Sequence, residues 1–382
     1  MENVSIIKCG DYTSEQVYRA VSRSIGLLGG MDHFVKPGEK VLLKCNLLMK
    51  KSPEEATTTH PEVAAAVARL VREAGAVPVL ADSPSGLFNV HALRVVYRGC
   101  GMEKIARRDH VALNENVGET EVFHPEGKII RSLTVMEILQ EVDAVIDIAK
   151  LKTHGMTIYT GAVKNLFGVI PGTAKAEYHL RMKRLEDFSN MLVDICTYVK
   201  PVLSVMDAVV GMEGQGPSAG DPRKIGAILA SESPFALDVA ACSMVGIDPD
   251  AVCTIQRARE RGLCSSLLQD LTLLGDPMED LLVRDFRIPE HKHVGMVEQY
   301  FGKDSRIGRF INFHFGPRPV FLQEGCIGCG NCAGNCPPKA ITMVNHRPEV
   351  DLKKCIRCYC CQELCPQKTV AIKRSWLFRI FQ

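Results

Sequence analysis

The C-terminal part of the sequence contains the same cysteine pattern twice. The runs CIGCGNCAGNCP, which starts at Cys326, and CIRCYCCQELCP, which starts at Cys355, both read Cys-x2-Cys-x2-Cys-x3-Cys-Pro. In this spacing three thiolates surround one iron–sulfur cube, and the fourth cysteine, which precedes a proline, reaches the other cube. The duplicated pattern therefore predicts a small domain built around two [4Fe-4S] clusters, which carry single electrons.

The same spacing predicts which cysteines bind each cluster. We expect one cluster at Cys326, Cys329, Cys332 and Cys365, and the other at Cys355, Cys358, Cys361 and Cys336. The extra cysteine of the second run, Cys360, falls where the first run has Asn331, so we expect it to pack beside the cluster without binding iron. Structural zinc is the alternative, but two matched sets of four cysteines favour iron–sulfur clusters. The region closely resembles the bacterial two-cluster ferredoxin domain.

Composition excludes some classes of partner. The 382 residues include 46 basic and 44 acidic side chains, and the formal net charge of +2 provides no global field for nucleic acid or an anionic membrane. The N-terminus lacks a basic segment followed by a long apolar one, and no apolar run is long enough for an integral membrane segment. We expect a cytoplasmic protein.

The remainder of the sequence alternates strand-length apolar runs with helical patterns, which is typical of βαβ units. Strands are expected at 4–9, 40–46, 76–83, 143–150, 201–210 and 224–231, and helices at 14–28 and from Pro61 to Gly75. We therefore expect an α/β fold with a largely parallel sheet and flanking helices, followed by a small α+β domain with two clusters. The expected divisions are an α/β domain at 1–290, a connection at 291–320, the cluster domain at 321–372 and a tail at 373–382.

Polar residues follow several of the expected strands. Ligands of open parallel sheets bind beyond the carboxyl ends of the strands, so these residues are candidates for one shared pocket. The candidates for binding a cofactor are Asn46, Asp82, Ser83 and Asn165. The candidates for catalysis are Lys150, Lys152, His154, Lys164, His179, Asp207 and Glu213. The three lysines would hold an anion, and a histidine or Glu213 would deliver protons.

Each candidate also has a structural interpretation. Strand ends need polar caps, a histidine is as often a hydrogen-bonded structural residue as a ligand, and the threonines before Pro61 are first of all candidates for a helix N-cap. The glycine-rich segment from Gly155 to His179 matches neither the phosphate-loop spacing nor the dinucleotide fingerprint, so a nicotinamide enzyme is not expected. The HKH run at 291–293 lies in the expected connection and is a weak candidate for metal.

Several segments, taken in order, resemble the DUF362 family of iron–sulfur proteins. They are KCN at 44–46, TTHP at 58–61, ADSPSG at 81–86, AKLKTHG at 149–155, GAVKNLFGVIPG at 161–172 with the following His179, and DAVVGMEGQGPSAGDP at 207–222. The resemblance implies an α/β domain with two appended [4Fe-4S] clusters. This architecture is frequent in anaerobes, and the resemblance identifies no substrate. The glycine-rich loop is also distantly similar to that of nickel-pincer lactate racemases, but Lys164-Asn165 stands where that family has Gly-Lys.

Three functions are compatible with these features. The first is an oxidoreductase whose clusters pass electrons to a small anionic substrate or a cofactor at the strand ends. The second is a non-catalytic electron carrier or docking protein, whose α/β domain recognises a redox partner protein. The third is a protein that handles a metal or a cofactor and uses His154 and His179 to bind it. The C-terminal KRSWLFRIFQ is too short to span a bilayer, and we expect it to fold back on the protein.

Overall fold

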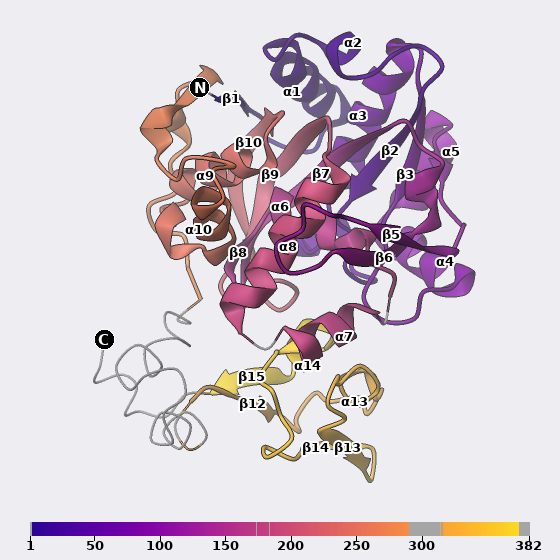
Figure 1. Cartoon of the computed structure of the whole chain (residues 1–382), viewed down its shortest axis with the longest axis vertical. Helices are drawn as coiled ribbons and strands as arrows, with labels where there is room; N and C mark the ends of the chain where they lie inside the picture. The colour runs from indigo at the N-terminus through magenta and orange to yellow at the C-terminus, as the bar shows by residue number, and fades with distance from the viewer. Residues whose placement is uncertain (1, 173, 183, 290–313, 315, 374–382) are drawn as a thin grey trace.

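The larger part of the chain folds around one mixed sheet of nine strands (Figure 1). The order is β11-β1-β10-β9-β7-β2-β3-β4, with β8 paired to β7. Strands β9, β7, β2, β3 and β4 are parallel to one another, whereas β10 is antiparallel to both of its neighbours. The computed structural model describes residues 2–172, 174–182, 184–289, 314 and 316–373. The strands are β1 (Glu2–Lys8), β2 (Lys40–Cys45), β3 (Val77–Ala81), β4 (Ala112–Leu113), β7 (Ala144–His154), β8 (Ile158–Thr160), β9 (Leu203–Glu213), β10 (Asp221–Ser231) and β11 (Leu271–Gly275).

Helices cover both faces of the sheet, which confirms the expected α/β class (Figure 1). One face packs against α1 (Ser14–Gly26), α3 (Pro61–Glu73), α4 (Val90–Gly99) and α5 (Met102–Asp109). The other packs against α6 (Ala162–Asn165), α8 (Leu185–Val199), α9 (Pro234–Met244) and α10 (Cys253–Glu260). Smaller elements are α2 (Met31–Phe34), α7 (Ala174–Arg181) and the hairpin of β5 (Glu119–Phe123) and β6 (Ser132–Met136).

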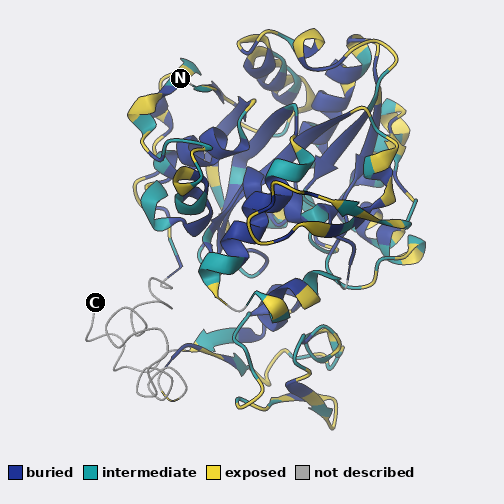
Figure 2. Ribbon diagram, in the orientation of Figure 1, coloured by how far each residue is buried: buried dark blue, intermediate teal, exposed yellow. Residues whose placement is uncertain are grey.

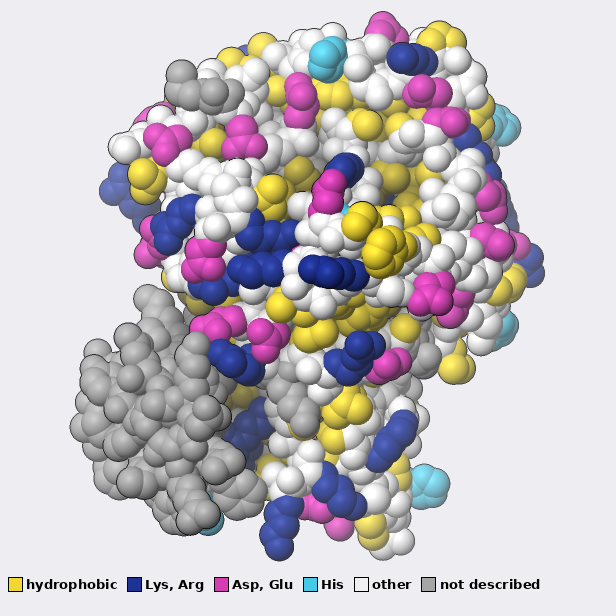
Figure 3. Space-filling view, in the orientation of Figure 1, with side chains coloured by type: hydrophobic (Ala, Val, Ile, Leu, Met, Phe, Trp, Pro, Cys, Tyr) yellow, Lys and Arg dark blue, Asp and Glu magenta, His cyan; other side chains and the backbone are white. Residues whose placement is uncertain are grey.

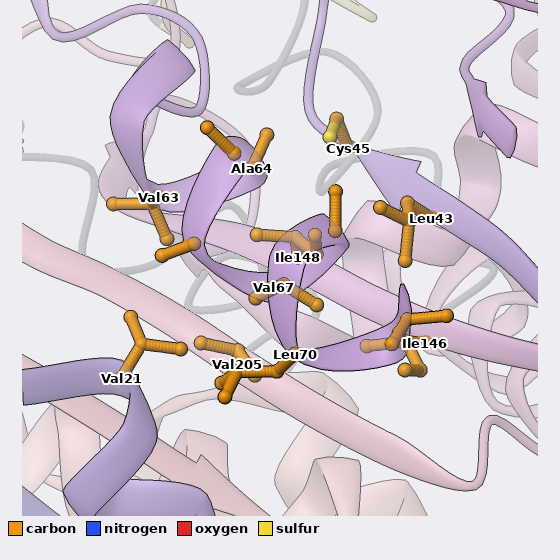
Figure 4. Packing of buried hydrophobic residues seen from close by; sticks show 14 of the residues in the cluster. Val21, Leu43, Cys45, Val63, Ala64, Val67, Leu70, Ile146, Ile148 and Val205 are labelled. Atoms are coloured by element: carbon orange, nitrogen blue, oxygen red, sulfur yellow. The ribbon is translucent and has the colours of Figure 1, made fainter. Parts of the chain in front are cut away.

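The core follows the two-residue period of the strands. In β2, Leu43 packs on the side of α3, and Leu42 packs on the opposite side of the sheet. In α3, Val63, Val67 and Leu70 lie on one face of the helix and meet the sheet (Figure 4). Buried residues accordingly concentrate along the strands and the inner faces of the helices (Figure 2).

The start of α3 corrects one expectation. The N-cap is His60, whose Nδ1 accepts a hydrogen bond from the backbone N–H of Glu62 at 3.2 Å, and Pro61 occupies the first turn. The threonine before it does not cap the helix. Thr59 Oγ1 instead donates to the carbonyl of Ile148 at 2.7 Å and ties the entry of the helix to β7.

Strand β7 is longer than the sequence pattern indicates. We expected a strand over 143–150, but β7 continues to His154. The reason is β8, which pairs with the end of β7 through Lys152 and Thr160 and supplies the hydrogen bonds that a longer strand requires. This extension carries the Lys150–His154 segment beyond the neighbouring β2.

The C-terminal part forms a small unit, here called the cysteine module (residues 316–373). It contains the antiparallel pairs β12 (Arg318–Phe321) with β15 (Val370–Lys373) and β13 (Ile341–Val344) with β14 (Arg347–Val350), and the short helices α13 (Asn331–Gly334) and α14 (Cys360–Glu363). Its core is separate and includes Ala340, Ile341 and Val370. In Figure 1 the module lies below the sheet, with α14 beside α7.

Within the described residues, no helix combines the length and the apolar character needed to cross a membrane. On the face shown in Figure 3, basic and acidic side chains are intermixed, as the small net charge suggests. The HKH run at 291–293 and the tail from residue 374 lie outside the described residues.

Candidate functional site

The cysteine module contains two cavities, and each is surrounded by one of the two cysteine sets that the spacing predicts. The first cavity is lined by Cys326, Cys329, Cys332 and Cys365, and the second by Cys336, Cys355, Cys358 and Cys361. The donor chemistry fits a cluster, because backbone N–H groups point at the cysteine sulfurs, as from Ala340 to Cys336 at 3.2 Å and from Thr369 to Cys365 at 3.3 Å.

A single metal ion fits this arrangement less well than a cube. Among the described residues, no three His, Cys, Asp or Glu side chains converge closely enough to hold one ion. Four sulfurs placed around a cavity instead match a ligand whose iron atoms are spread over a cube. The module therefore carries two [4Fe-4S] clusters, and electron transfer follows from their chemistry.

The two cysteine sets differ in their surroundings. Cys329 of the first set is exposed to solvent, whereas Cys361 of the second set is buried. Cys360, which we expected to pack beside the cluster, is buried and lines the second cluster cavity. It also lines a third cavity, between the module and the α/β domain. The second set thus adjoins this third cavity through Cys360, whereas Cys329 opens the first set to solvent.

One short segment of the module, residues 362–368, makes the polar contacts to the α/β domain. Glu363 Oε1 lies 3.0 Å from Nε2 of His154, at the end of β7. The hydroxyl of Ser218 donates to the backbone carbonyl of Glu363 at 2.6 Å. Lys51 donates to the carbonyl of Pro366 at 3.2 Å. The residues that carry cluster cysteines and the residues that dock the module are therefore parts of the same segment.

The loop after β9 takes part in this docking. In this loop, GMEGQGPSAGDP at 211–222, Pro217 lines the cavity and Ser218 contacts the module. Glu213 has a different place. Its carboxylate meets Arg287 Nε at 2.8 Å and accepts from the backbone N–H of Arg287, and it is not part of the cavity lining.

The cavity between the two parts, here called the interdomain cavity, has a volume of about 90 Å³. From the α/β domain it is lined by Asn46, Leu48, Asp82, Ser83, Lys152, Lys164, Asn165, Phe167, Lys175 and His179, among others. From the module it is lined by Asn335, Cys360, Glu363 and Leu364. All four residues that we expected to bind a cofactor are therefore brought together here, with three of the seven catalytic candidates.

Lys152 and Lys164 bring positive charge to the interdomain cavity. The ammonium group of Lys152 donates to Asn46 Oδ1 at 2.9 Å and to the carbonyl of Thr57 at 2.7 Å, both neutral acceptors. Burial, with the repulsion of Lys164 and Lys150, lowers the pKa of Lys152 to about 7. Burial also lowers the pKa of Lys164. Among the described residues neither lysine forms an ion pair, although the charge of Glu363 opposes the lowering of both pKa values.

A buried network behind the cavity holds its polar wall in place. Lys44 Nζ lies 2.9 Å from Asp82 Oδ1 and 3.3 Å from Asn165 Oδ1. The amide of Asn165 in turn donates to Asp147 at 2.7 Å. Gly168 allows this close approach, because a Cβ there would meet Asp82 Oδ1 at 2.1 Å and Lys44 Nζ at 2.5 Å. Charge pairing inside the domain thus fixes the positions of Asp82 and Asn165.

His154 is neutral and its tautomer follows from its contacts. Its Nδ1 accepts from the backbone N–H groups of Met156 and Thr157 at 3.0 and 3.2 Å, so the ring proton resides on Nε2, which faces Glu363. Burial and the charge of Lys164 lower the pKa of His154 to about 4. The ring therefore positions Glu363 and stays neutral at physiological pH.

His179 lines the cavity directly. It lies on α7, and its ring stacks on Phe188 with centroids 4.5 Å apart. Burial lowers the pKa of His179 to about 4, so this ring is also neutral at physiological pH. The α7 residue Lys175 closes the same wall, where it donates to the carbonyls of Ser83 at 2.7 Å and Ile170 at 2.6 Å.

Lys150 and Asp207 lie together but away from the interdomain cavity. They are opposite each other on the parallel strands β7 and β9, and Lys150 Nζ is 2.8 Å from Asp207 Oδ2. Tyr12 accepts from Lys150 and donates to Asp207, both at 2.8 Å, and its ring stacks on His60. The strand register thus joins this pair into a second, separate polar cluster.

Sequence reasoning did not select three residues of the site. Lys44 sits within an apolar strand, and a lone charge in such a run was the available signal. Cys360 and Glu363 lie inside the second cysteine run, where ligand spacing was the only feature interpreted. A single sequence contains no pattern that predicts the contact of Cys360 and Glu363 with the α/β domain.

Two family models match the chain. "Domain of unknown function (DUF362)" matches residues 41–243, and "4Fe-4S dicluster domain" matches residues 318–366. A thylakoid-associated protein of Synechocystis is 34% identical over 291 residues, which is 76% of this chain and 88% of that protein.

Two solved structures are similar in part. The lactate racemase apoprotein of Thermoanaerobacterium thermosaccharolyticum has a TM-score of 0.41 at 12% identity, over 64% of this chain and 56% of that one. A Thermotoga maritima protein has a TM-score of 0.36 at 14% identity, over 62% of this chain and 60% of that one. The chain thus spans less than two thirds of either structure. The family matches are decisive: the chain belongs to the DUF362 family and carries a C-terminal 4Fe-4S dicluster domain.

Proposed function

We propose that the chain is an oxidoreductase that reduces a small anionic substrate in the interdomain cavity. The observation that carries this proposal is the composition of the cavity wall. Cys360 and Glu363 of the cysteine module line the same space as Lys152, Lys164 and His179 of the α/β domain. An electron carrier needs no polar cavity beside its second cysteine set.

The surroundings of the cysteines support a direction for the electrons. The [4Fe-4S] clusters supply single electrons when bound. The first cysteine set, with exposed Cys329, is open to a redox partner protein, and the second set, with buried Cys361, adjoins the interdomain cavity through Cys360. From this arrangement we infer that electrons enter from a partner protein at the first cysteine set. They leave into the interdomain cavity from the second set.

The residues of the α/β domain would bind and orient the substrate. Lys152 and Lys164 attract an anionic group, and the neutral ring of His179 offers one N–H donor. Phe167, with Leu364 of the module, supplies an apolar wall that excludes water. The ammonium group of Lys152 has a pKa of about 7, so it can donate a proton to the reduced product.

The expected electron transfer can be measured directly. The anaerobically prepared, photoreduced protein is mixed with the anionic fraction of a small-molecule extract of the source cells, and the visible cluster absorbance is followed by stopped flow. We expect reoxidation by this fraction to slow about tenfold or more in Lys164→Gln, because an ammonium contact to an anion is lost. Lys104→Gln, at an exposed position of α5, is the matched control and should react like wild type.

The carrier function is the alternative outcome of the same experiment. If Lys164→Gln and the wild-type protein are reoxidised equally fast by the small-molecule fraction and by protein acceptors, the cavity has no part in electron transfer. We further propose a cytoplasmic location, since cysteine ligands of iron require a reducing compartment. Fractionation of cells tests this, and recovery of the chain with membranes, as the name of the Synechocystis relative suggests for that protein, would overturn it.

A further inference from the structure

We propose that the interdomain cavity binds a small oxyanion with two negative charges, held between the ammonium groups of Lys152 and Lys164. This inference rests on the proposed function, because it names the substrate class of the same site. It can nevertheless be tested without any electron transfer. The charged groups around the cavity differ in whether the protein itself provides their partners.

The other lysines of the region are satisfied by the protein. Lys44 is paired with Asp82, and Lys150 is paired with Asp207. Lys175 donates to two backbone carbonyls and to Ser83. These three ammonium groups are structural.

Lys164 differs from these lysines. It lies in α6, whose first N–H groups are capped by buried Asp238, from Ala162 at 2.7 Å and from Val163 at 3.1 Å. This cap fixes the helix that carries Lys164 at the cavity wall. In the described part of the chain, no acceptor takes a hydrogen bond from Lys164, and its side chain lines the cavity. The Lys164 side chain is half-buried, and the charge of Glu363 favours its ammonium group without accepting a hydrogen bond from it. The donor positions of Lys164 are therefore open to an anionic ligand in the cavity.

Lys152 extends the same site. Its two acceptors, on Asn46 and Thr57, are neutral, and one of its three donor positions remains for a ligand. Because Asn46 Oδ1 accepts from Lys152, the Nδ2 group of Asn46 is available as a further donor to the cavity. Lys152, Lys164 and Asn46 thus provide donors from three different elements.

The two carboxylates that line the cavity cannot neutralise all of the lysines around it. Asp82 meets Lys44 at 2.9 Å and accepts from the backbone N–H of Leu47 at 2.6 Å. Glu363 faces the proton of His154, and its charge also favours the ammonium group of Lys164. When Lys152, Lys164 and Lys175 are all protonated, as a bound anion favours, they and Lys44 oppose two carboxylates, and the two charges that remain match a dianion.

The size of the cavity limits the ligand further. About 90 Å³ is far below the 300 to 1,000 Å³ of sites for drug-sized ligands, so a nucleotide does not fit. An oxyanion such as a short dicarboxylate or a phosphate group has the required charge and several acceptor oxygens. Ammonium groups would bind a dicarboxylate and a phosphate group in the same way, and the experiment below distinguishes the two ligands.

The test is anaerobic titration calorimetry on the oxidised full-length protein with its clusters. Oxalate and inorganic phosphate are the two probes, with chloride at equal ionic strength as the reference. We expect one site per chain for at least one probe, with an affinity at least about tenfold lower in Lys164→Gln, partial recovery in Lys164→Arg, and no change in Lys104→Gln. Binding of oxalate alone assigns a carboxylate ligand, and binding of phosphate alone assigns a phosphate ligand.

A second variant keeps the proposal open to refutation if Lys164→Gln does not fold. Asn46→Asp places a carboxylate beside Lys152 and should abolish probe binding while it raises the melting temperature. The proposal is overturned if neither probe binds beyond the chloride reference, or if probe binding survives both substitutions. Probe binding without reoxidation of the reduced protein by any anion would leave this inference in place and remove the oxidoreductase function.

Discussion

Nε2 of His154, at the end of β7, lies 3.0 Å from Oε1 of Glu363, which stands in α14 between two cluster cysteines. Burial would raise the pKa of Glu363, but His154 and Lys164 lower it to about 2, so the carboxylate is charged. This contact joins the end of β7 to the segment that supplies Cys361 and Cys365, and the hydrogen bonds from Ser218 and Lys51 to the same segment add to it. It contributes a charge to the junction that holds the cysteine module over the cavity.

Removal of the His154 side chain should loosen this junction. His154→Ala leaves the Glu363 carboxylate buried without its donor, and we expect a loss of about 2 to 3 kcal/mol in the free energy of unfolding. Adding Glu363→Gln should restore part of this loss, because a neutral amide is less costly to bury. A denaturant-unfolding cycle with both single variants and the double variant measures the coupling; additive losses would show that the two residues act independently.

Three histidines with lowered pKa values predict how stability depends on pH. Burial lowers the pKa values of His60, His154 and His179 to about 4. The unfolded chain, with histidine pKa values near 6.5, then binds more protons than the folded chain, so the stability present above pH 6.5 is lost as the pH falls towards 4. We expect a decrease on the order of several kcal/mol across this window by urea unfolding. His179→Gln should flatten the curve, and an unchanged curve would contradict the neutral state of this ring.

Iron analysis tests the cysteine assignment. We expect about eight iron and eight sulfide per chain after anaerobic purification. Cys360→Ala should leave this content unchanged, because Cys360 lies off the repeat, whereas Cys361→Ala should lose a cluster or convert it to a three-iron form. The reverse result would mean that the ligand is Cys360 and that the alignment of the two runs is shifted by one residue.

Binding of the anion should be coupled to proton uptake. The pKa of Lys152 is lowered to about 7 by burial and by Lys164 and Lys150, against the favourable charges of Asp82 and Glu363. A bound dianion raises this pKa, so at pH 8 the complex takes up a proton that the free protein lacks.

Calorimetry in two buffers of different ionisation enthalpy measures this uptake. The affinity for the probe should fall as the pH rises from 7 to 9. Equal binding enthalpies in both buffers at pH 8 would show that Lys152 does not change its protonation.

Gly168 should tolerate no side chain. The Cβ of Gly168→Ala would overlap Asp82 and Lys44, so we expect a loss of about 2 kcal/mol or more and weaker probe binding. Gly26→Ala is the matched control, since no atom lies within 4 Å of the new Cβ and α1 favours alanine. Similar melting temperatures for the two variants would contradict the close packing of the Lys44 network.

The sequence allowed the fold class, the cofactor and much of the cavity wall to be predicted, because each has a local signal. Cysteine spacing predicted two sets, and strand ends led to Asn46 and Asp82. Asp207 was one of two expected partners for the three lysines, the substrate being the other, but its pairing with Lys150 in particular depends on the register between β7 and β9. The contact of His154 with Glu363 depends on how two separately folded parts pack, and no periodicity encodes that.

In the proposed arrangement the anion site adjoins the second cysteine set. Electron–nuclear double resonance of the reduced protein, with ¹³C-oxalate or ³¹P-phosphate bound, measures this proximity through the hyperfine coupling of the ligand nucleus to a cluster. We predict a coupling to one cluster only, which disappears in Lys164→Gln and is retained in Lys104→Gln. Absence of any coupling in a sample with saturated probe, or a coupling that Lys164→Gln leaves unchanged, would contradict the account.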